Sequence, residues 1–318
     1  MSRPDSTIPR TRQWGIGVAV ITAVISGFAV YLNSFGVRSW TAAGTPSATY
    51  TTAKNLVAAF VLFALTAVLA RVGYRDNPSV GDAGRAAGRG KVAGGLALIA
   101  VVGGSLPFLL FFEGLSRATS TQAAVLHKSL LVWVALLAVP LLGERLGPLH
   151  VAAIGLLIGG QLVIAGGLAG IEFGTGEMMI LAATILWALE TVVAKVVLTR
   201  VPALTVGMVR MGAGAVILVV YGVVTGALSH LTALGGTEWL WVLATGVVLS
   251  GYVATWYTGL ARAQAVDVTA VLVLGAVVTV ALRSGLQGAA LPSPIGIAMV
   301  GAGGVLAVAA AARWQHTR

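Results

Sequence analysis

The sequence contains no cysteine and few charged residues. The absence of cysteine excludes disulfide bonds and thiolate metal sites, and it leaves the redox compartment undetermined. Only 9% of the 318 residues are charged, whereas a soluble domain carries about 25%. Hydrophobic residues make up 58% of the chain, and the mean hydropathy is +0.94. These values exclude an ordinary soluble globular protein and predict an integral membrane protein that has the lipid bilayer as a partner.

Acidic residues are scarcer still, with 10 against 20 basic residues and a net charge of +10. In a soluble protein this excess would suggest nucleic acid as a partner. In a membrane protein the cations must first be assigned to one side of the bilayer or the other, so we predict no nucleic-acid partner.

The chain also lacks the short motifs of common enzyme classes. It has no H-E-x-x-H, no G-x-S-x-G and no Walker sequence, and no dense group of carboxylates or histidines that would hold a metal ion. We therefore predict that the protein is not an enzyme and uses no cofactor or metal ion. Without a Walker motif it is not an ATPase, so any uphill transport would depend on a proton or ion gradient or on a partner subunit.

Long apolar runs are what the chain has in abundance. Each is close to the ~20 residues that a helix needs to cross ~30 Å of hydrocarbon. A signal peptide is the alternative for the first run, but this run is longer than a typical secretory core and lacks an A-x-A cleavage site. The pattern predicts an all-α integral membrane protein with ten transmembrane helices, at about 14–35, 47–70, 92–112, 119–139, 148–168, 177–198, 203–226, 237–258, 267–288 and 293–312.

Two parts of the sequence resemble each other in order. Residues 112–118 (FEGLSRA) align with 257–263 (YTGLARA), and residues 132–136 (VWVAL) align with 278–282 (VTVAL), at separations of 145 and 146. We interpret this series as a tandem duplication. Five spans per repeat is an odd number, so the second repeat must be inverted relative to the first. The predicted divisions are a tail at 1–13, a first five-helix repeat at 14–169, an inverted second repeat at 177–312 and a tail at 313–318.

The basic residues outside the spans are distributed unevenly. If the amino terminus is cytoplasmic, the outer loops hold only Arg38 and Arg117, and this bias predicts a multi-pass protein of the cell membrane with both termini in the cytoplasm. The largest loop, 71–91, is rich in Gly and Arg and is predicted to be mobile. The cytoplasmic segments then hold Arg3, Arg10, Arg12, Arg71, Arg75, Arg85, Arg89, Lys91, Arg145, Arg200, Arg262, Arg313 and Arg318.

Two segments of the first repeat carry a specific resemblance. These are GLSRATSTQAAVL, between the third and fourth spans, and PLLGERLGPLHVAAIGLLIGG, which leads into the fifth. From Trp14 to about Ala312 the chain resembles the EamA-type permeases of the drug/metabolite transporter superfamily. One departure is that Ala290 and Leu291 stand in the second repeat where the first has Glu144 and Arg145.

The resemblance and the inverted repeats imply a secondary transporter that works by alternating access. Members of the family move small solutes such as amino acids, drugs and metabolites, often outward, so we expect a small-molecule substrate and an exporter. Two alternatives stay open: a drug or cation exporter of the same fold, and an intramembrane lipid translocase or lipid-modifying enzyme that would use Glu190 and His127 as acid and base. The sequence leaves the substrate identity, the direction, the coupling ion and the oligomeric state undetermined.

Ionisable residues at membrane depth are the candidates for function, because each costs ~2.5–3.5 kcal/mol unless it faces protein or water. Lys54 and Arg210 occupy matching places in the two repeats, which favours a role in the scaffold of both. Lys128, Glu190 and Arg283 match apolar residues in the other repeat, as a single asymmetric ligand would require. The candidates for substrate binding are Lys128, His127, Glu190, Trp187, Trp256, Glu113, Arg283 and Tyr252.

Several candidates have plainer alternatives. His127 could be a packing residue of the bundle, and Glu113 a solvated residue at the outer mouth. Lys195 is close enough to the end of its span to serve as an interfacial anchor. Trp187, Trp256 and Tyr252 could line a cavity, but aromatic residues near span ends are more often anchors at the membrane interface.

Depth predicts one ion pair. Glu190 and Arg210 lie at nearly equal distances from the tight turn that joins spans six and seven, so we predict that they form a structural charge pair. Cations still outnumber carboxylates at membrane depth after this pairing. The excess predicts an anionic solute, such as an amino acid or a small organic acid, with Lys128 as its main charge contact and Trp187 or Trp256 against its apolar part.

Overall fold

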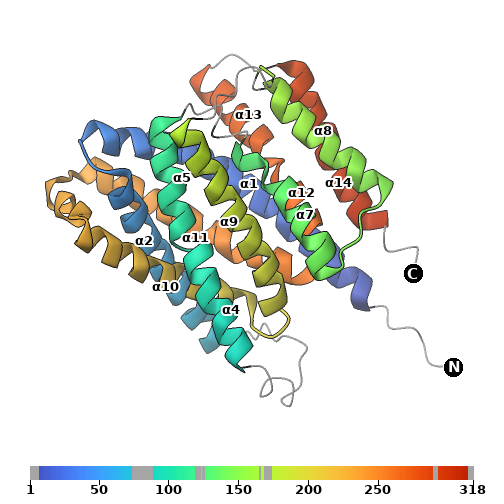
Figure 1. Ribbon diagram of the computed structural model, residues 1–318, viewed down its shortest axis with the longest axis horizontal. Helices are drawn as coiled ribbons and strands as arrows, with labels where there is room; N and C mark the ends of the chain where they lie inside the picture. Colours follow the sequence, from blue (N-terminus) through green and yellow to red (C-terminus); the bar gives the residue numbers. More distant parts are fainter. Residues whose placement is uncertain are drawn as a thin grey trace.

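The computed structural model is an all-helical membrane protein (Figure 1). It describes residues 7–73, 89–118, 123, 126–164, 166–167, 174–288 and 293–313. Within these residues, eight helical stretches are long and apolar enough to cross a membrane, and Leu126–Leu142 and Pro148–Ile164 are two shorter ones. The elements are α1 Thr7–Ala42, α2 Ser47–Arg71, α4 Arg89–Val102, α5 Leu106–Arg117, α7 Leu130–Leu142, α8 Pro148–Ile164, α9 Thr175–Val197, α10 Ala203–Val224, η2 Ala227–Ala233, α11 Gly236–Arg262, α12 Ala265–Leu272, α13 Gly275–Gln287 and α14 Pro294–Arg313.

The ten predicted spans all have helical counterparts, with some corrections at their ends. Helix α1 begins at Thr7 and ends at Ala42, so it extends beyond the predicted span 14–35 at both ends and includes part of the predicted tail 1–13. Most of the predicted mobile loop, 74–88, and the tail beyond Arg313 lie outside the described residues. Ala290 and Leu291 also lie outside them.

Packing between the helices follows the repeats. Helix α8 packs on α14, α1 on α11, α5 on α9, and α2 on α10, so each principal contact joins a helix of one half to a helix of the other. The α8–α14 pair is visible side by side in Figure 1. The α1–α13 contact has its counterpart in the α7–α9 contact when the halves are exchanged, as expected for two related five-helix units.

Glycine permits the closest of these contacts. At the α8–α14 interface, a Cβ at Gly160 would lie 2.8 Å from the carbonyl oxygen of Gly296, and a Cβ at Gly296 would lie 2.9 Å from that of Gly160. Neither position has room for a side chain, so the two backbones approach each other as small residues allow in membrane helices.

The third predicted span is broken in the middle. Helix α4 ends at Val102 and α5 begins at Leu106, with Gly103, Gly104 and Ser105 between them. The hydroxyl of Ser105 donates to the carbonyl oxygens of Ala100 and Val101, both at 3.1 Å, which satisfies backbone groups at the break. The matching sequence in the second half, VLSGY at 248–252, lies inside the continuous helix α11. The break therefore distinguishes the two repeats.

Candidate central binding cavity

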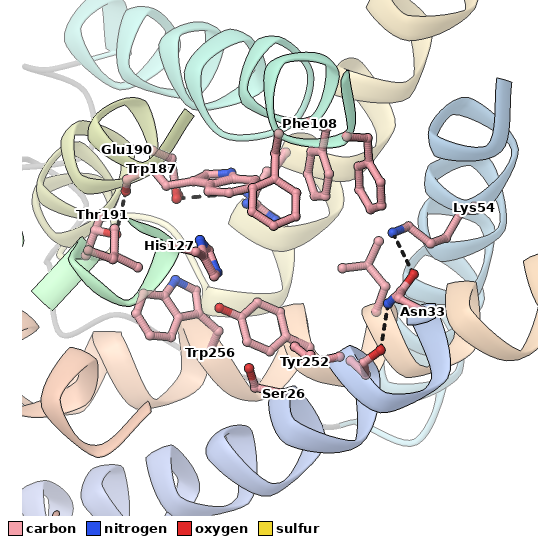
Figure 2. Close-up of a pocket in the computed structure, with 17 residues that line it drawn as sticks. Ser26, Asn33, Lys54, Phe108, His127, Trp187, Glu190, Thr191, Tyr252 and Trp256 are labelled. Carbon is pink, nitrogen blue, oxygen red and sulfur yellow. Dashed lines mark hydrogen bonds and ion pairs between the residues drawn. The ribbon is translucent and has the colours of Figure 1, made fainter. Parts of the chain in front are cut away.

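A cavity of about 140 Å³ lies between the two halves (Figure 2). Helices α1, α2, α5, α9, α10 and α11 contribute to its wall, together with His127 and Leu130. Its lining combines a lysine, an arginine, a glutamate and a histidine with a large share of aromatic rings. The lining residues are Ser26, Ala29, Val30, Asn33, Lys54, Phe108, Phe111, Phe112, His127, Leu130, Trp187, Glu190, Thr191, Arg210, Leu249, Tyr252 and Trp256.

Two cations reach the cavity from equivalent places in the repeats. Helix α2 follows Pro46 and α10 follows Pro202. The ψ angles of these prolines, 145° and 143°, are extended and not helical, so each helix begins directly after its proline. Lys54 and Arg210 each lie eight residues beyond these prolines. The equivalence of the two cations was apparent in the sequence, but it indicated a role in the scaffold, whereas both side chains line the cavity.

Lys54 has neutral partners in the described part of the chain. Its Nζ lies 3.3 Å from Oδ1 of Asn33 and 4.2 Å from the centre of the Phe112 ring. The same oxygen of Asn33 accepts a hydrogen bond from the hydroxyl of Tyr50 at 2.9 Å. Only 3% of Lys54 is exposed, and no carboxylate of the described residues lies within ion-pair distance of its ammonium group. The cation is therefore held in place without being neutralised.

The predicted charge pair is present in the structure. Nε of Arg210 lies 4.0 Å from Oε2 of Glu190, and the hydroxyl of Tyr257 donates to Oε1 of the same carboxylate. Glu190 and Arg210 are 2% and 5% exposed, so water screens their attraction little. Nε of Arg210 has no hydrogen-bond partner among the described residues, which leaves a buried donor beside the cavity.

The helix break between α4 and α5 makes room for this pair. A Cβ at Gly103 would overlap Cγ of Glu190, and a Cβ at Gly104 would overlap the carbonyl oxygen of Arg210. The carbonyl oxygen of Gly103 also accepts a hydrogen bond from Nε1 of Trp187 at 3.2 Å. The glycines thus bring the backbone of α4 against α9 and α10, where a side chain would hold them apart.

Aromatic rings surround His127. Its ring centre lies 5.1 Å from that of Phe111 and 5.2 Å from that of Trp187. Nδ1 of His127 is buried and has no hydrogen-bond partner among the described residues. Tyr252 and Trp256 stack with an interplanar angle of 10°, and Figure 2 shows them on the same side of the cavity as His127, with Lys54 and Asn33 on the other. The ammonium group of Lys54 therefore lies across the cavity from the rings of Tyr252 and Trp256.

Five of the eight predicted binding residues come together here. His127, Glu190, Trp187, Trp256 and Tyr252 all line the cavity, and for the two tryptophans and the tyrosine this replaces the alternative of interface anchors.

Three other candidates lie elsewhere. Lys128 is half-buried next to His127 but does not line the cavity, and Arg283 is exposed on α13. Glu113 sits at the end of α5, where Oε1 pairs with Nη2 of Arg117 at 2.5 Å and Oε2 accepts from Ser47 at 3.2 Å. Lys128, which we predicted as the main charge contact, is therefore not part of the cavity wall, whereas Lys54 is.

Lys195 is also placed differently from its prediction as an interfacial anchor. Its ammonium group turns inward and donates to the carbonyl oxygens of Leu260 and Ala263, at 2.6 and 2.5 Å. These carbonyls belong to the last turn of α11 and the residue after it. Lys195 therefore stabilises a helix end within the protein.

The architecture and the cavity together define a multi-pass membrane transporter built from two repeats. A family model described as EamA-like transporter family matches residues 13–166 and 174–309, and the chain belongs to that family. It is accordingly a secondary transporter of a small molecule and not an enzyme. No curated protein matches the chain. One solved structure, described only as the crystal structure of a protein, is 22% identical in sequence to this chain. The alignment covers 94% of this chain and 99% of the other, and its TM-score of 0.65 shows a shared fold.

Proposed function

We propose that the protein exports a small metabolite with a carboxylate or another anionic group, bound in the central cavity by Lys54 and Arg210. The observation that carries the proposal is the incomplete pairing of these two cations. Lys54 has no carboxylate partner among the described residues, and Nε of Arg210 has no acceptor there. A buried cation without a counter-ion is costly, and an anionic guest would offset that cost.

The size and the lining of the cavity agree with a small solute. A volume of about 140 Å³ is below the ~300 Å³ at which drug-sized pockets begin. The rings of Trp187, Trp256 and Tyr252 supply apolar surface opposite Lys54. An amino acid or a small organic acid has this combination of an anionic head and a compact apolar part.

The orientation that we propose places both chain termini in the cytoplasm. In the described residues, the end of the bundle where α1 begins holds most of the basic residues outside the spans, whereas the opposite end holds Arg38 and Arg117. Cytoplasmic loops carry this excess in membrane proteins. Because the chain lacks a Walker motif, uphill export would draw on a proton or ion gradient or on a partner subunit.

The test begins with a stabilisation screen of the purified protein. Small organic acids and amino acids are compared with their neutral amides, since a binder raises stability by RT ln(1 + [L]/Kd). Flux of the best acid into liposomes is then measured for Lys54→Gln, with Lys128→Gln as the matched control. We expect Lys54→Gln to lower flux at least tenfold and Lys128→Gln to retain it. Retained anion flux in Lys54→Gln, with loss only in Glu190→Gln, would favour export of an apolar cation bound through Glu190 instead.

A further inference from the structure

A second group of ionisable side chains lies away from the cavity, at the end of the bundle where α1 begins. We call it the terminal ion cluster, and it joins five elements: α1, the α7–α8 loop, α8, α9 and α12. Its members are Arg12, Glu144, His150, Lys195 and Asp267.

Asp267 is the centre of the cluster. Its Oδ2 lies 2.6 Å from Nη2 of Arg12, and its Oδ1 lies 3.0 Å from Nε2 of His150. The Asp267 side chain is fully buried, and the side chains of Arg12 and His150 are 17% and 5% exposed. Substitution of either partner of such a buried carboxylate is strongly destabilising, because part of its charge would be left without compensation.

Glu144 bridges the two repeats. It lies in the loop between α7 and α8 of the first repeat and accepts hydrogen bonds from the backbone N–H groups of Ala265 and Val266, at 2.6 and 3.0 Å. These N–H groups begin α12, which belongs to the second repeat. A carboxylate at this position satisfies unpaired donors and interacts favourably with the positive end of the helix dipole.

Lys195 binds the end of α11, on the other side of the turn between α11 and α12. Its bonds to the carbonyl oxygens of Leu260 and Ala263 stabilise the end of α11, just before α12 begins. The turn between α11 and α12 is therefore fixed by a cation at the helix end that precedes it and by an anion at the helix start that follows it. Neither charged residue belongs to the α11–α12 turn itself, because Lys195 lies in α9 and Glu144 in the loop between α7 and α8.

The cluster lies between the cavity and the end of the bundle. Glu190 lines the cavity and Lys195 belongs to the cluster, and five residues of α9 separate them by about 7.5 Å along the helix axis. Helices α1 and α11, which also line the cavity, meet the cluster at Arg12 and Leu260. Its ion pairs and hydrogen bonds thus hold together the ends of three cavity-lining helices.

The sequence does not repeat this arrangement at the opposite end. At the repeat spacings, Glu144 matches Ala290, His150 matches Gly296 and Lys195 matches Phe35. In the described residues of that end, α1 and α11 are joined through Glu238. Its carboxylate accepts from the hydroxyl of Ser39 at 2.8 Å, and its backbone carbonyl oxygen accepts from Nε1 of Trp40 at 3.1 Å. Among the described residues, the ion pairs that join different helices at an end of the bundle are therefore those of Asp267, whereas Glu113 and Arg117 at the opposite end pair within α5.

We infer that the terminal ion cluster is a latch that closes the cytoplasmic exit of the cavity and makes the cytoplasm-closed conformation the resting state. The inference rests on the transport and the orientation proposed above. Alternating access requires the helix ends to separate on one side in every cycle, so these bonds must break before the cavity opens to the cytoplasm. Weakening them shifts the population toward the cytoplasm-open state.

The absence of cysteine makes the test direct, because any introduced cysteine is labelled without background. Thr191 lines the cavity on α9, so Thr191→Cys reports whether the cavity is open. An impermeant maleimide is applied to inside-out vesicles and, separately, to intact cells. We expect Glu144→Ala to raise the labelling rate from the cytoplasmic side at least fivefold and to lower the rate from outside.

Controls separate the latch from general destabilisation. Glu177 caps α9 at its opposite end by accepting from the backbone N–H of Gly174 at 3.1 Å, so Glu177→Ala should leave both labelling rates unchanged. If Glu144→Ala fails to express, Asp267→Asn and Lys195→Met give the same measurement. The inference would be overturned if the protein that carries only Thr191→Cys were labelled from the cytoplasmic side as fast as these variants. It would also be overturned if the variants raised the labelling rate only from the outer side. Labelling needs no solute, so a failed flux assay would count against the proposed function but would leave the measured labelling rates, and the inference drawn from them, unchanged.

Discussion

Lys54 and Arg210 occupy equivalent positions in the two repeats and enter the same cavity from opposite ends. Lys54 lies seven residues from the start of α2 and Arg210 seven residues from the start of α10, about 10 Å along each helix. Since the repeats are inverted, α2 starts at one end of the bundle and α10 at the other. A solute that crosses the protein would therefore meet one cation after the other at different depths.

The pairing of Glu190 with Arg210 predicts coupled effects of substitution. Arg210→Gln alone should lower the free energy of unfolding by about 3–5 kcal/mol, because it leaves the carboxylate buried without a cation. Glu190→Gln with Arg210→Gln should recover most of that loss. Thermal stability in detergent for both single variants and the double variant gives the coupling energy. Additive losses in the double variant would show that the two groups act independently.

Gly104 is predicted to tolerate no side chain. Gly104→Ala should destabilise the protein by about 1–3 kcal/mol, since the new methyl group would overlap the carbonyl oxygen of Arg210. Gly212→Ala on α10 is the matched control, because a Cβ there meets nothing within 4 Å. That substitution should be neutral or stabilising by up to about 1 kcal/mol. Equal melting temperatures for the two variants would contradict the close approach.

Trp256 should contribute to solute affinity. Trp256→Ala is expected to raise the Kd of the solute found in the stabilisation screen about tenfold, which corresponds to about 1.4 kcal/mol, because it removes aromatic surface from the cavity wall. Trp239, which is 38% exposed near the start of the same helix, serves as the control. Isothermal titration should find the Kd of Trp239→Ala unchanged, and a similar loss in both variants would argue against a role of the cavity.

Glu144 should give the stability of the protein a measurable pH dependence. Burial raises the pKa of its carboxyl group above the usual 4.5, although the backbone N–H groups of Ala265 and Val266 lower it in part. A raised pKa means that the folded state binds the proton more tightly than the unfolded state. The free energy of unfolding therefore falls as the pH rises from 4.5 through the folded pKa.

Glu144→Gln removes this titration, so the stability of the parent relative to the variant should decrease over that interval and then level off. Melting curves of both proteins between about pH 4 and pH 8 measure the difference. A relative stability that increases with pH would show that the folded pKa lies below 4.5.

The sequence was sufficient to predict the helical architecture and the pair of Glu190 and Arg210, because both follow from helix lengths and from distances along the chain. It was not sufficient to choose between His127 and Lys128. These neighbours point about 100° apart on a helix, and which of them faces the cavity depends on a rotation that packing determines. The partners of Glu144 were also hidden, because they are backbone N–H groups 121 and 122 residues away that leave no side-chain signal.

The break between α4 and α5, which the continuous helix α11 does not repeat, prevents the two halves from exchanging identical shapes. Symmetry therefore does not require the outward-open and inward-open forms to have equal energies, and the half-saturation concentrations on the two sides of the membrane are free to differ. Such a difference cannot create net flow, because the forward and reverse rate constants around a closed cycle have to balance at equilibrium. The gradients decide the direction of transport, and the unequal halves decide at which concentrations on each side the carrier becomes saturated.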